Sequence, residues 1–375
     1  MSMNATSVGR VLVRAPNWVG DAVMAEPAIR RLRDLFRPAH LAILARPWVA
    51  GLYEGEGLAD EIIAAGAQGM RAFIAEARRL RERQFDLAVL LQNAFSAALL
   101  ARAAGIRKVA GYPTDGRRFL LDPVIALDPN RKASHEVFYY LRIAMSLETI
   151  LAGPGTKDQT SGEQVLTGDA VTPRLRATPE ARHRAGRLLG QEGIEAKHNR
   201  APLLVLNPGA TNSRAKQWLP ERFAALADLL TAQIGFQTAI IGAQGDVEVA
   251  RAVARQMRTR GAVLAGKTDI STLKGLLSRA SLLISNDTGS AHVGAALGIP
   301  TIVVFGPTEH FATHPYSDKA RVVRHQVECS PCMLRDCPID HRCMTGVQVE
   351  DVGRAIESLI GLRTLPVGVN SAAHN

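Results

Sequence analysis

Short apolar runs alternate with helix-compatible segments along the first half of the chain. Apolar runs at residues 10–15, 41–45 and 86–91 predict strands, and the amphipathic segment 22–36 predicts a helix between the first two. Parallel strands need a long crossover, usually a helix. The alternation therefore predicts a doubly wound α/β sheet with parallel strands.

The second half of the chain repeats this pattern. Strands are expected at 203–206, 237–241, 263–265, 282–284 and 301–305, with helices at 220–232, 270–279 and 290–297. Residues from about 152 to 178 are rich in Gly, Pro, Ser and Thr, a composition typical of a linker. The sequence thus predicts two Rossmann-like domains facing across a cleft, over residues 1–170 and 171–347, with a helix and flexible tail over 348–375.

The segment 285–300 reads as a strand end, a polar turn, a helix of small residues and a stop before the next strand. Its turn is Asn286-Asp287-Thr288-Gly289. Ligands of open α/β sheets bind where parallel strands end, and the free N–H groups of a following helix favour an anion. The segment therefore predicts an anion site, although Asp287 and Thr288 are also residues that simply cap helices.

Two further loops carry candidate chemistry. Asp21 follows the first predicted strand and begins a helix, so its carboxylate is either a helix cap or a reacting group. Lys216 lies in a polar loop that follows the strand at 203–206, where it is either a solvated lysine or a cation that meets the same ligand.

Charge and composition narrow the class of protein. The formal net charge of +10 favours acidic partners, but the sequence contains no dense basic arm and only 5% aromatic residues, so a nucleic-acid partner is not expected. Neither a secretory signal nor a spanning apolar run is evident, which predicts a cytoplasmic protein whose contact with a membrane is peripheral.

Four cysteines fall within fifteen residues near the C-terminus, with His341 among them: Cys329, Cys332, Cys337 and Cys343. Such spacing is compatible with a structural zinc ion or an iron–sulfur cluster that clips a loop. Four free thiols in a loop ordered by Pro331 and Pro338 are the alternative.

Several of these motifs occur together in one order: residues 16–24, 92–99, 105–112, 207–220, and 286–289 with His292. In the order and content of these motifs, the chain resembles the ADP-heptose:lipopolysaccharide heptosyltransferases of glycosyltransferase family 9, in particular the heptosyltransferase II group. The resemblance implies the glycosyltransferase-B fold and an inverting transfer of L-glycero-D-manno-heptose from ADP-heptose onto the inner-core heptose of lipopolysaccharide. It also implies a monomer that needs no cofactor and works at the anionic face of the inner membrane.

The resemblance assigns roles to individual residues. Asp21 matches the catalytic base, and the donor-binding positions are Thr211, Lys216, Gln244, Thr268, Asp287, Thr288, Gly289 and His292. Gln244 departs from the family, since some members carry an acidic residue there. From their charge, Arg117 and Arg118 are expected to meet the carboxylates and phosphates of the acceptor, with Arg46 and Lys108 as further candidates.

The same roles follow from the chemistry of sugar transfer. The incoming hydroxyl needs a base and the departing diphosphate needs positive charge, which Lys216 and a helix terminus supply without an Asp-x-Asp metal motif. Two alternatives stay open. One is another glycosyltransferase-B enzyme or an epimerase that uses a different sugar nucleotide. The other is a non-catalytic nucleotide-binding module, against which the intact Asp21 counts.

Overall fold

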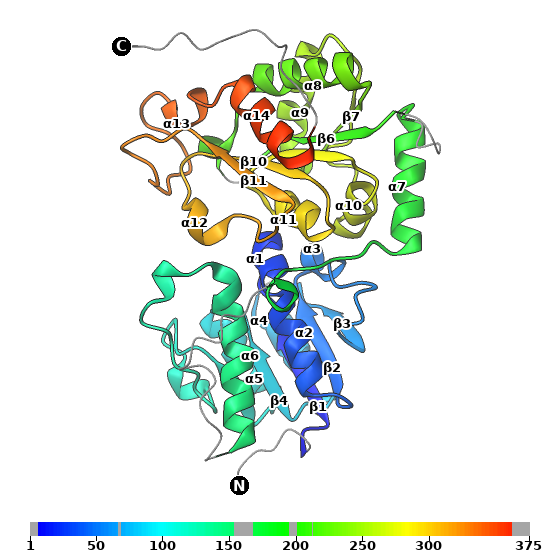
Figure 1. Cartoon of the computed structure of the whole chain (residues 1–375). Coiled ribbons are helices and arrows are strands. Elements are labelled where there is room, and N and C mark those ends of the chain that lie inside the picture. The colour runs from blue at the N-terminus through cyan, green and yellow to red at the C-terminus, as the bar shows by residue number, and fades with distance from the viewer. Residues whose placement is uncertain (1–6, 67–68, 154–167, 195–200, 212, 362–375) are drawn as a thin grey trace. The chain divides into compact units, whose positions relative to one another are not determined.

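The computed structural model describes residues 7–66, 69–153, 168–194, 201–211 and 213–361 (Figure 1). The chain forms two compact units. The first comprises residues 1–178 with 269–271 and 311–316, and the second contains the remainder. The division falls at Thr178, a few residues beyond the predicted boundary. Residues 154–167 of the predicted linker and 362–375 of the predicted tail lie outside the described residues.

The first unit is built on a parallel sheet in the order β3-β2-β1-β4-β5. Its strands are β1 (Arg10–Arg14), β2 (His40–Ala45), β3 (Glu61–Ala64), β4 (Leu87–Leu90) and β5 (Lys108–Gly111). Its helices are α1 (Val19–Met24), α2 (Glu26–Leu35), α3 (Pro47–Ala50), α4 (Met70–Arg81), α5 (Phe95–Ala103) and α6 (Glu136–Ala152). The strand order reverses between β1 and β4, which makes their carboxyl ends a topological switch point.

Helices cover both faces of this sheet. Because parallel crossovers are right-handed, helices that follow β1 and helices that follow β4 must lie on opposite faces. Accordingly α2 packs against α6, and α4 packs against α5 on the other face (Figure 1). The apolar sides of strands and helices meet in cores that include Leu12, Leu44 and Leu90.

One prediction for the first unit needs correction, and some of its elements were missed. The single helix expected over 22–36 is two helices that meet at Ala25, and Pro27 in the first turn of α2 has no N–H to continue the hydrogen bonds of α1. The strand β3 and the arginine-rich helix α4 were not predicted, since β3 has only four residues and α4 is strongly polar.

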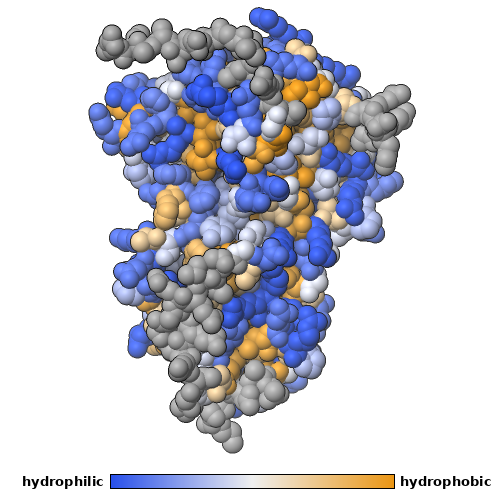
Figure 2. Space-filling model, viewed as in Figure 1, coloured by the Kyte–Doolittle hydropathy of each residue, from blue (hydrophilic) through white to orange (hydrophobic). Residues whose placement is uncertain are grey.

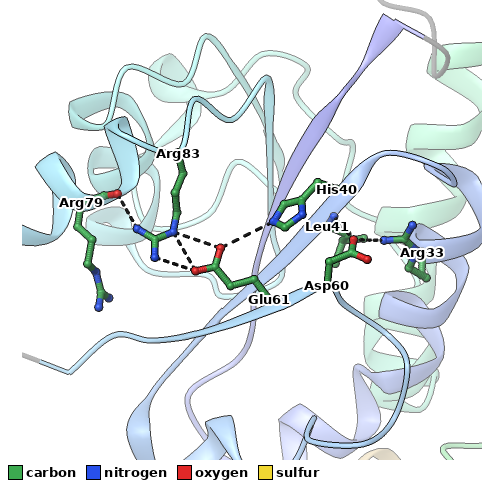
Figure 3. A network of polar contacts seen from close by, with 7 residues as sticks. All are labelled: Arg33, His40, Leu41, Asp60, Glu61, Arg79 and Arg83. Carbon is green, nitrogen blue, oxygen red and sulfur yellow. Dashed lines mark hydrogen bonds and ion pairs between the residues drawn. The ribbon is translucent and has the colours of Figure 1, made fainter.

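An ion-pair network fastens β3 and its neighbours at the edge of the sheet (Figure 3). Arg83 Nη2 lies 2.7 Å from Glu61 Oε1, and Asp60 Oδ2 accepts bonds from Leu41 N at 2.8 Å and Arg33 Nη1 at 2.7 Å. The bond from Arg83 lowers the pKa of Glu61, and the backbone bond from Leu41 lowers that of Asp60. The carboxylates at this edge are therefore neutralised within the protein.

The second unit is built on a parallel sheet in the order β11-β10-β9-β6-β7-β8. The strands are β6 (Leu203–Asn207), β7 (Gln237–Ile240), β8 (Gly261–Val263), β9 (Leu282–Asn286), β10 (Thr301–Phe305) and β11 (Ala320–Arg324). Helices in this half of the chain are α7 (Pro179–Gln191), α8 (Pro220–Ile234), α9 (Val247–Gln256), α10 (Ile270–Leu277), α11 (Gly289–Ala296), α12 (His310–Thr313), α13 (Arg342–Thr345) and α14 (Val349–Ile360). The switch point here lies between β6 and β9.

The sequence explains where the main helices of this unit begin and end. Helix α8 begins with Pro220, whose fixed φ suits a first helical turn, and ends at Gly235 in the left-handed conformation. Helix α14 packs on α8 and β11, so the predicted C-terminal helix is part of the second unit. Strand β8 begins two residues before the predicted 263–265, and β11 was not predicted.

Two parallel α/β units confirm the predicted fold class. In the space-filling view, hydrophilic residues cover much of the described surface on the side shown, and apolar residues form small groups (Figure 2). Among the residues that the structure describes, no helix is both long and apolar enough to cross a bilayer.

Candidate functional site

The switch point of the second unit gathers buried polar side chains. Asn207 ends β6, and the sheet register sets it beside Ser285 on β9. Its Nδ2 donates to Ser285 Oγ at 3.0 Å and to Thr288 Oγ1 at 2.7 Å. Asn207 and Ser285 are buried, so these bonds satisfy groups that water does not reach. The loops after β6 and β9 are thereby joined at one edge of the sheet.

Lys216 reaches this edge from the loop after β6. Its Nζ lies 2.7 Å from Asp287 Oδ2, and Thr308 Oγ1 donates to the same oxygen at 2.7 Å. The Asp287 side chain is 9% exposed and that of Lys216 is 26% exposed. Lys216 is therefore tethered, which differs from the solvated lysine weighed above.

Asp287 and Thr288 do not act as ordinary helix caps. Thr288 occupies the N-cap position of α11, but its side chain makes no capping bond. Its hydroxyl accepts from Asn207, while Asp287 binds Lys216 and Thr308. The first N–H groups of α11 are thus not occupied by the Thr288 side chain.

Two neighbouring segments fix the turn that carries Lys216. Asn286 Oδ1 accepts from Trp218 N at 3.0 Å, and Asn286 Nδ2 donates to Pro208 O at 2.7 Å. On the other side, Ala215 N donates to Arg335 O at 2.9 Å and Ala215 O lies 2.7 Å from His341 Nε2. The cysteine-containing segment therefore packs against the residue next to Lys216.

The remaining predicted donor residues lie on loops or on the helix at this edge. Thr211 is in the exposed loop after β6, Gln244 and Thr268 follow β7 and β8, and Gly289 and His292 are on α11. A side chain on Gly266 would come within 2.4 Å of Gln244 Oε1, so the loops after β7 and β8 lie in contact. The donor contacts of these residues stay predictions.

Asp246 was not predicted as a site residue. Its Oδ2 accepts from Ala243 N at 2.9 Å, and a Cβ on Gly209 would lie 2.2 Å from its carboxyl carbon. Burial raises the pKa of Asp246. The carboxyl group thus holds together the loops after β6 and β7. At position 209 the carboxyl group leaves room only for glycine.

Asp21 lies at the switch point of the first unit, in the first turn of α1. The N-cap of that helix is Trp18, so Asp21 does not occupy the capping position. Asp21 Oδ1 accepts a bond from Tyr140 Oη at 3.2 Å. Burial and the neighbouring Asp21 raise the pKa of Tyr140 well above its usual value, which keeps the phenol a hydrogen-bond donor. Tyr140 was not predicted as a site residue.

Two arginines share one acceptor beside this loop. Asn17 Oδ1 accepts from Arg14 Nη2 at 2.8 Å and from Arg46 Nε at 3.4 Å. Burial, followed by repulsion from Arg46, lowers the pKa of Arg14 to about 10. Within the described residues no carboxylate forms an ion pair with either arginine. The carboxyl ends of β1 and β2 therefore carry positive charge that the protein leaves without an anion.

The structure separates Arg117 from Arg118. Arg117 is fully buried, and its guanidinium donates to Tyr112 O at 2.9 Å and to Gln92 O at 2.5 Å. It joins the loops after β4 and β5 and has no surface left for an acceptor, which corrects the prediction that both arginines meet the acceptor directly. Arg118 is exposed, so a direct contact is retained for this residue alone.

The four cysteines are free thiols with different exposure. Cys329 and Cys332 are exposed, Cys337 is half-buried and Cys343 is buried. Burial raises the pKa of Cys343, and His341 N donates to Cys337 Sγ at 3.3 Å. Over the described ranges, no three His, Cys, Asp or Glu side chains are arranged to hold a metal ion.

Comparison with known proteins identifies the family. The family model of glycosyltransferase family 9 (heptosyltransferase) matches residues 73–342, most of the chain. The chain belongs to this family. It is therefore a glycosyltransferase, as the resemblance in the sequence implied.

Curated relatives and solved structures agree with this family. The lipopolysaccharide heptosyltransferase 2 of Escherichia coli K12 is 28% identical over 84% of the chain and 88% of its own length. The lipooligosaccharide heptosyltransferase 2 of Haemophilus influenzae is 27% identical over the same shares. The solved structure of E. coli ADP-heptose lipopolysaccharide heptosyltransferase II has a TM-score of 0.75 at 25% identity, covering 93% of this chain and 98% of that one.

Proposed function

We propose that this heptosyltransferase family member transfers L-glycero-D-manno-heptose from ADP-heptose to the inner-core heptose of lipopolysaccharide, with inversion at the anomeric carbon. The names of the relatives with 27% and 28% identity support the donor and acceptor classes. The observation that carries the proposal is the tethered Lys216 beside Asp287 and Thr288 at a switch point. This is a fixed cation at the edge where α/β sheets bind nucleotides.

The second unit would bind the donor. Lys216 supplies a cation for the diphosphate, and the first N–H groups of α11, at Gly289 and beyond, favour its negative charge. Asp287 orients Lys216 through their ion pair. Because these groups are held by neighbouring loops, little reorganisation is needed when negative charge develops on the leaving group.

The first unit would supply the base. In the proposed step the Asp21 carboxylate takes the proton of the acceptor hydroxyl, and the hydroxyl oxygen attacks the anomeric carbon. The bond from that carbon to the phosphate oxygen breaks, and ADP leaves with the electron pair. A single displacement of this kind inverts the configuration. Tyr140 acts as a positioning residue, since its hydroxyl bonds the carboxylate.

Anionic groups of the acceptor fit the charge at the first unit's switch point. Arg46 is half-buried and shares the neutral Asn17 oxygen with Arg14, which is buried and also donates to the carbonyls of Ala15 and Leu44. A phosphate or carboxylate beside Arg46 would therefore neutralise positive charge that no carboxylate of the described residues pairs with. Arg118 is the exposed arginine that we retain from the sequence prediction. The acceptor is lipid-linked, which is consistent with a monomer that works at the anionic cytoplasmic face of the inner membrane.

The decisive experiment incubates the protein with ADP-heptose and a heptose-terminated, truncated lipopolysaccharide. A product heavier by one heptose, formed with release of ADP, is the expected result. Turnover with another sugar nucleotide but not ADP-heptose would favour a different glycosyltransferase-B activity, and ADP binding without turnover would favour the non-catalytic module. Gln244 is the residue that makes the donor screen worthwhile, since some family members carry an acidic residue there.

A separate hypothesis concerns Cys329, Cys332, Cys337 and Cys343. As placed, the thiols do not form a metal site, so a structural zinc ion or iron–sulfur cluster would require them to rearrange. His341 and Arg335 both contact Ala215, the residue before Lys216. A metal bound by the cysteines would therefore also stabilise the turn that carries Lys216. Metal analysis of anaerobically purified protein tests this. About one zinc ion or one cluster per chain supports the hypothesis, and a content well below that leaves four free thiols.

A further inference from the structure

Large apolar side chains are exposed on one face of the first unit. Met70 and Ile74 are one turn apart on α4 and are 73% and 43% exposed. Phe95 and Leu99 repeat this spacing on α5, and Phe119, after β5, is 75% exposed. We refer to these five residues as the α4–α5 face. Soluble proteins rarely expose apolar side chains in groups without a binding partner.

The elements that carry these residues are in contact. Helix α4 packs beside α5, and the rings of Phe95 and Phe119 lie 6.1 Å apart between centroids. Both helices follow parallel strands, so they run in the same direction and begin at the carboxyl edge of the sheet. Met70, Ile74 and Phe95 are in the first half of their helices, near this edge, and Leu99 is at the middle of α5. Asp21 follows β1 at the same edge.

Exposed basic side chains lie on the same elements as the apolar residues. Arg71 and Arg78 are exposed on α4, and Arg118 is exposed beside Phe119. Two carboxylates on these elements are engaged: Glu76 pairs with Arg79 at 2.6 Å, and Asp115 accepts from the backbone of Phe95 at 2.6 Å. The exposed Glu82 lies at the far end of α4. In the described part of the chain, no carboxylate forms an ion pair with Arg71, Arg78 or Arg118. The face therefore combines exposed apolar groups with unpaired positive charge.

We propose that the α4–α5 face docks the enzyme onto an anionic lipid bilayer. Apolar side chains at the centre of such a surface enter the headgroup region, while arginines at its margin bind lipid phosphates. A second copy of the chain fits this face less well. A two-fold interface would bring the unpaired arginines of both copies to one surface, where their like charges repel each other. This proposal rests on the proposed function. Docking through this face would hold the sheet edge that carries Asp21 near a lipid-linked acceptor.

Vesicle sedimentation tests the face directly. The probes are vesicles of phosphatidylglycerol and phosphatidylethanolamine in equal parts, compared with phosphatidylcholine alone. We expect the double variants Ile74→Ser with Phe119→Ser, and Arg71→Glu with Arg78→Glu, each to lower partitioning onto the anionic vesicles by about tenfold or more. Matched controls are Ile150→Ser on α6, on the opposite face, and Arg37→Glu, both exposed positions. The controls should retain wild-type partitioning.

Other outcomes would overturn the proposal. These are equal binding to both kinds of vesicle, a loss no larger than that of the controls, or a loss that follows dissociation of a dimer in sedimentation velocity. Each double variant should transfer heptose to a delipidated acceptor as fast as wild type. Vesicle binding is measured without donor or acceptor. A failure of the docking proposal is therefore distinguishable from a failure of the proposed heptosyl transfer.

Discussion

The two switch points of this molecule have the same topology but different electrostatics. In the second unit, Lys216 is paired with Asp287, and the polar groups around Asn207 bond one another. In the first unit, Arg14 and Arg46 share one neutral oxygen of Asn17, and Asp21 accepts from the uncharged Tyr140. The polar groups of the second unit's switch point are thus already paired with one another, whereas the first unit's switch point carries positive charge without an ion pair.

This difference agrees with a division of labour in sugar transfer. A leaving diphosphate is stabilised best by donors that are fixed before the reaction, because no reorganisation is then needed. A base must instead be able to take up a proton, and an anionic acceptor is attracted by cations that form no ion pair within the protein. We therefore interpret the second unit as the donor side and the first as the acceptor side.

The largest expected effect comes from Asp21→Asn. The amide keeps the size of the side chain and can still accept a bond from Tyr140, but it cannot take a proton. We expect kcat to fall at least ~100-fold, while folding and ADP binding stay normal. Steady-state transfer assays, circular dichroism and calorimetric titration with ADP measure these quantities. A folded Asp21→Asn protein with near-normal kcat would refute Asp21 as the base.

The matched control is Tyr140→Phe, which removes the hydroxyl and leaves Asp21 in place. A positioning role predicts a smaller, several-fold fall in kcat. If Tyr140→Phe were as damaging as Asp21→Asn, proton transfer would have to be reassigned.

The next effect concerns Lys216→Ala. It removes the cation proposed for the diphosphate and leaves Asp287 without its ion pair, so donor use should weaken by about 2 kcal/mol, roughly 30-fold in kcat/KM for ADP-heptose. The KM for the acceptor should barely move. Lys319→Ala, at an exposed lysine of the same unit, is the control. Unchanged ADP affinity in Lys216→Ala would remove the second unit as the donor side.

A smaller effect is expected from Arg46→Gln, which tests the unpaired charge of the first unit. The acceptor KM should rise about tenfold, with the donor KM unchanged, and the increase should shrink as salt screens the charge. Arg37→Gln removes an exposed arginine that already has a carboxylate neighbour and should have no effect. An acceptor KM that stays at the wild-type value would return Arg46 to a structural role.

The sequence predicted the strands that carry both sites, because buried parallel strands such as β1, β6 and β9 are continuous apolar runs. It also placed Asp21, Lys216 and Asp287 after strands. It could not predict which polar groups meet across loops. The pairing of Asn207 with Thr288 depends on the register of β6 against β9, which are far apart in sequence.

Arg117 is a second case in which the sequence could not predict contacts between loops. In the sequence it is one of two adjacent arginines in a polar turn, and both appeared suited to an anionic acceptor. Only the folded loops reveal that backbone carbonyls of Tyr112 and Gln92 occupy its guanidinium. Tyr140 was overlooked for a related reason, since its contact with Asp21 joins α6 to α1.

The smallest effect is expected from Glu61→Gln. This substitution tests whether the paired charges at the edge of the first unit's sheet serve only stability, in contrast to the unpaired charges at its switch point. At the sheet edge Arg83 and His40 surround Glu61, and the bond from Arg83 lowers the pKa of its carboxyl group (Figure 3). The pair is partly exposed, so its loss should cost only about 1 kcal/mol in the free energy of unfolding at neutral pH. Transfer kinetics should not change.

The pH dependence of this stability difference follows from the direction of the pKa shift. Because the folded protein holds Glu61 ionised more readily than the unfolded chain does, its contribution is complete above the ordinary glutamate range and is lost as the pH falls through the lowered pKa. Urea unfolding of wild type and Glu61→Gln should therefore differ at pH 7 and converge in acid. A difference that persists in acid, or a changed kcat, would mean that the edge network does more than neutralise charge. The contrast between the paired edge and the unpaired switch point would then no longer separate structural from functional charge in this unit.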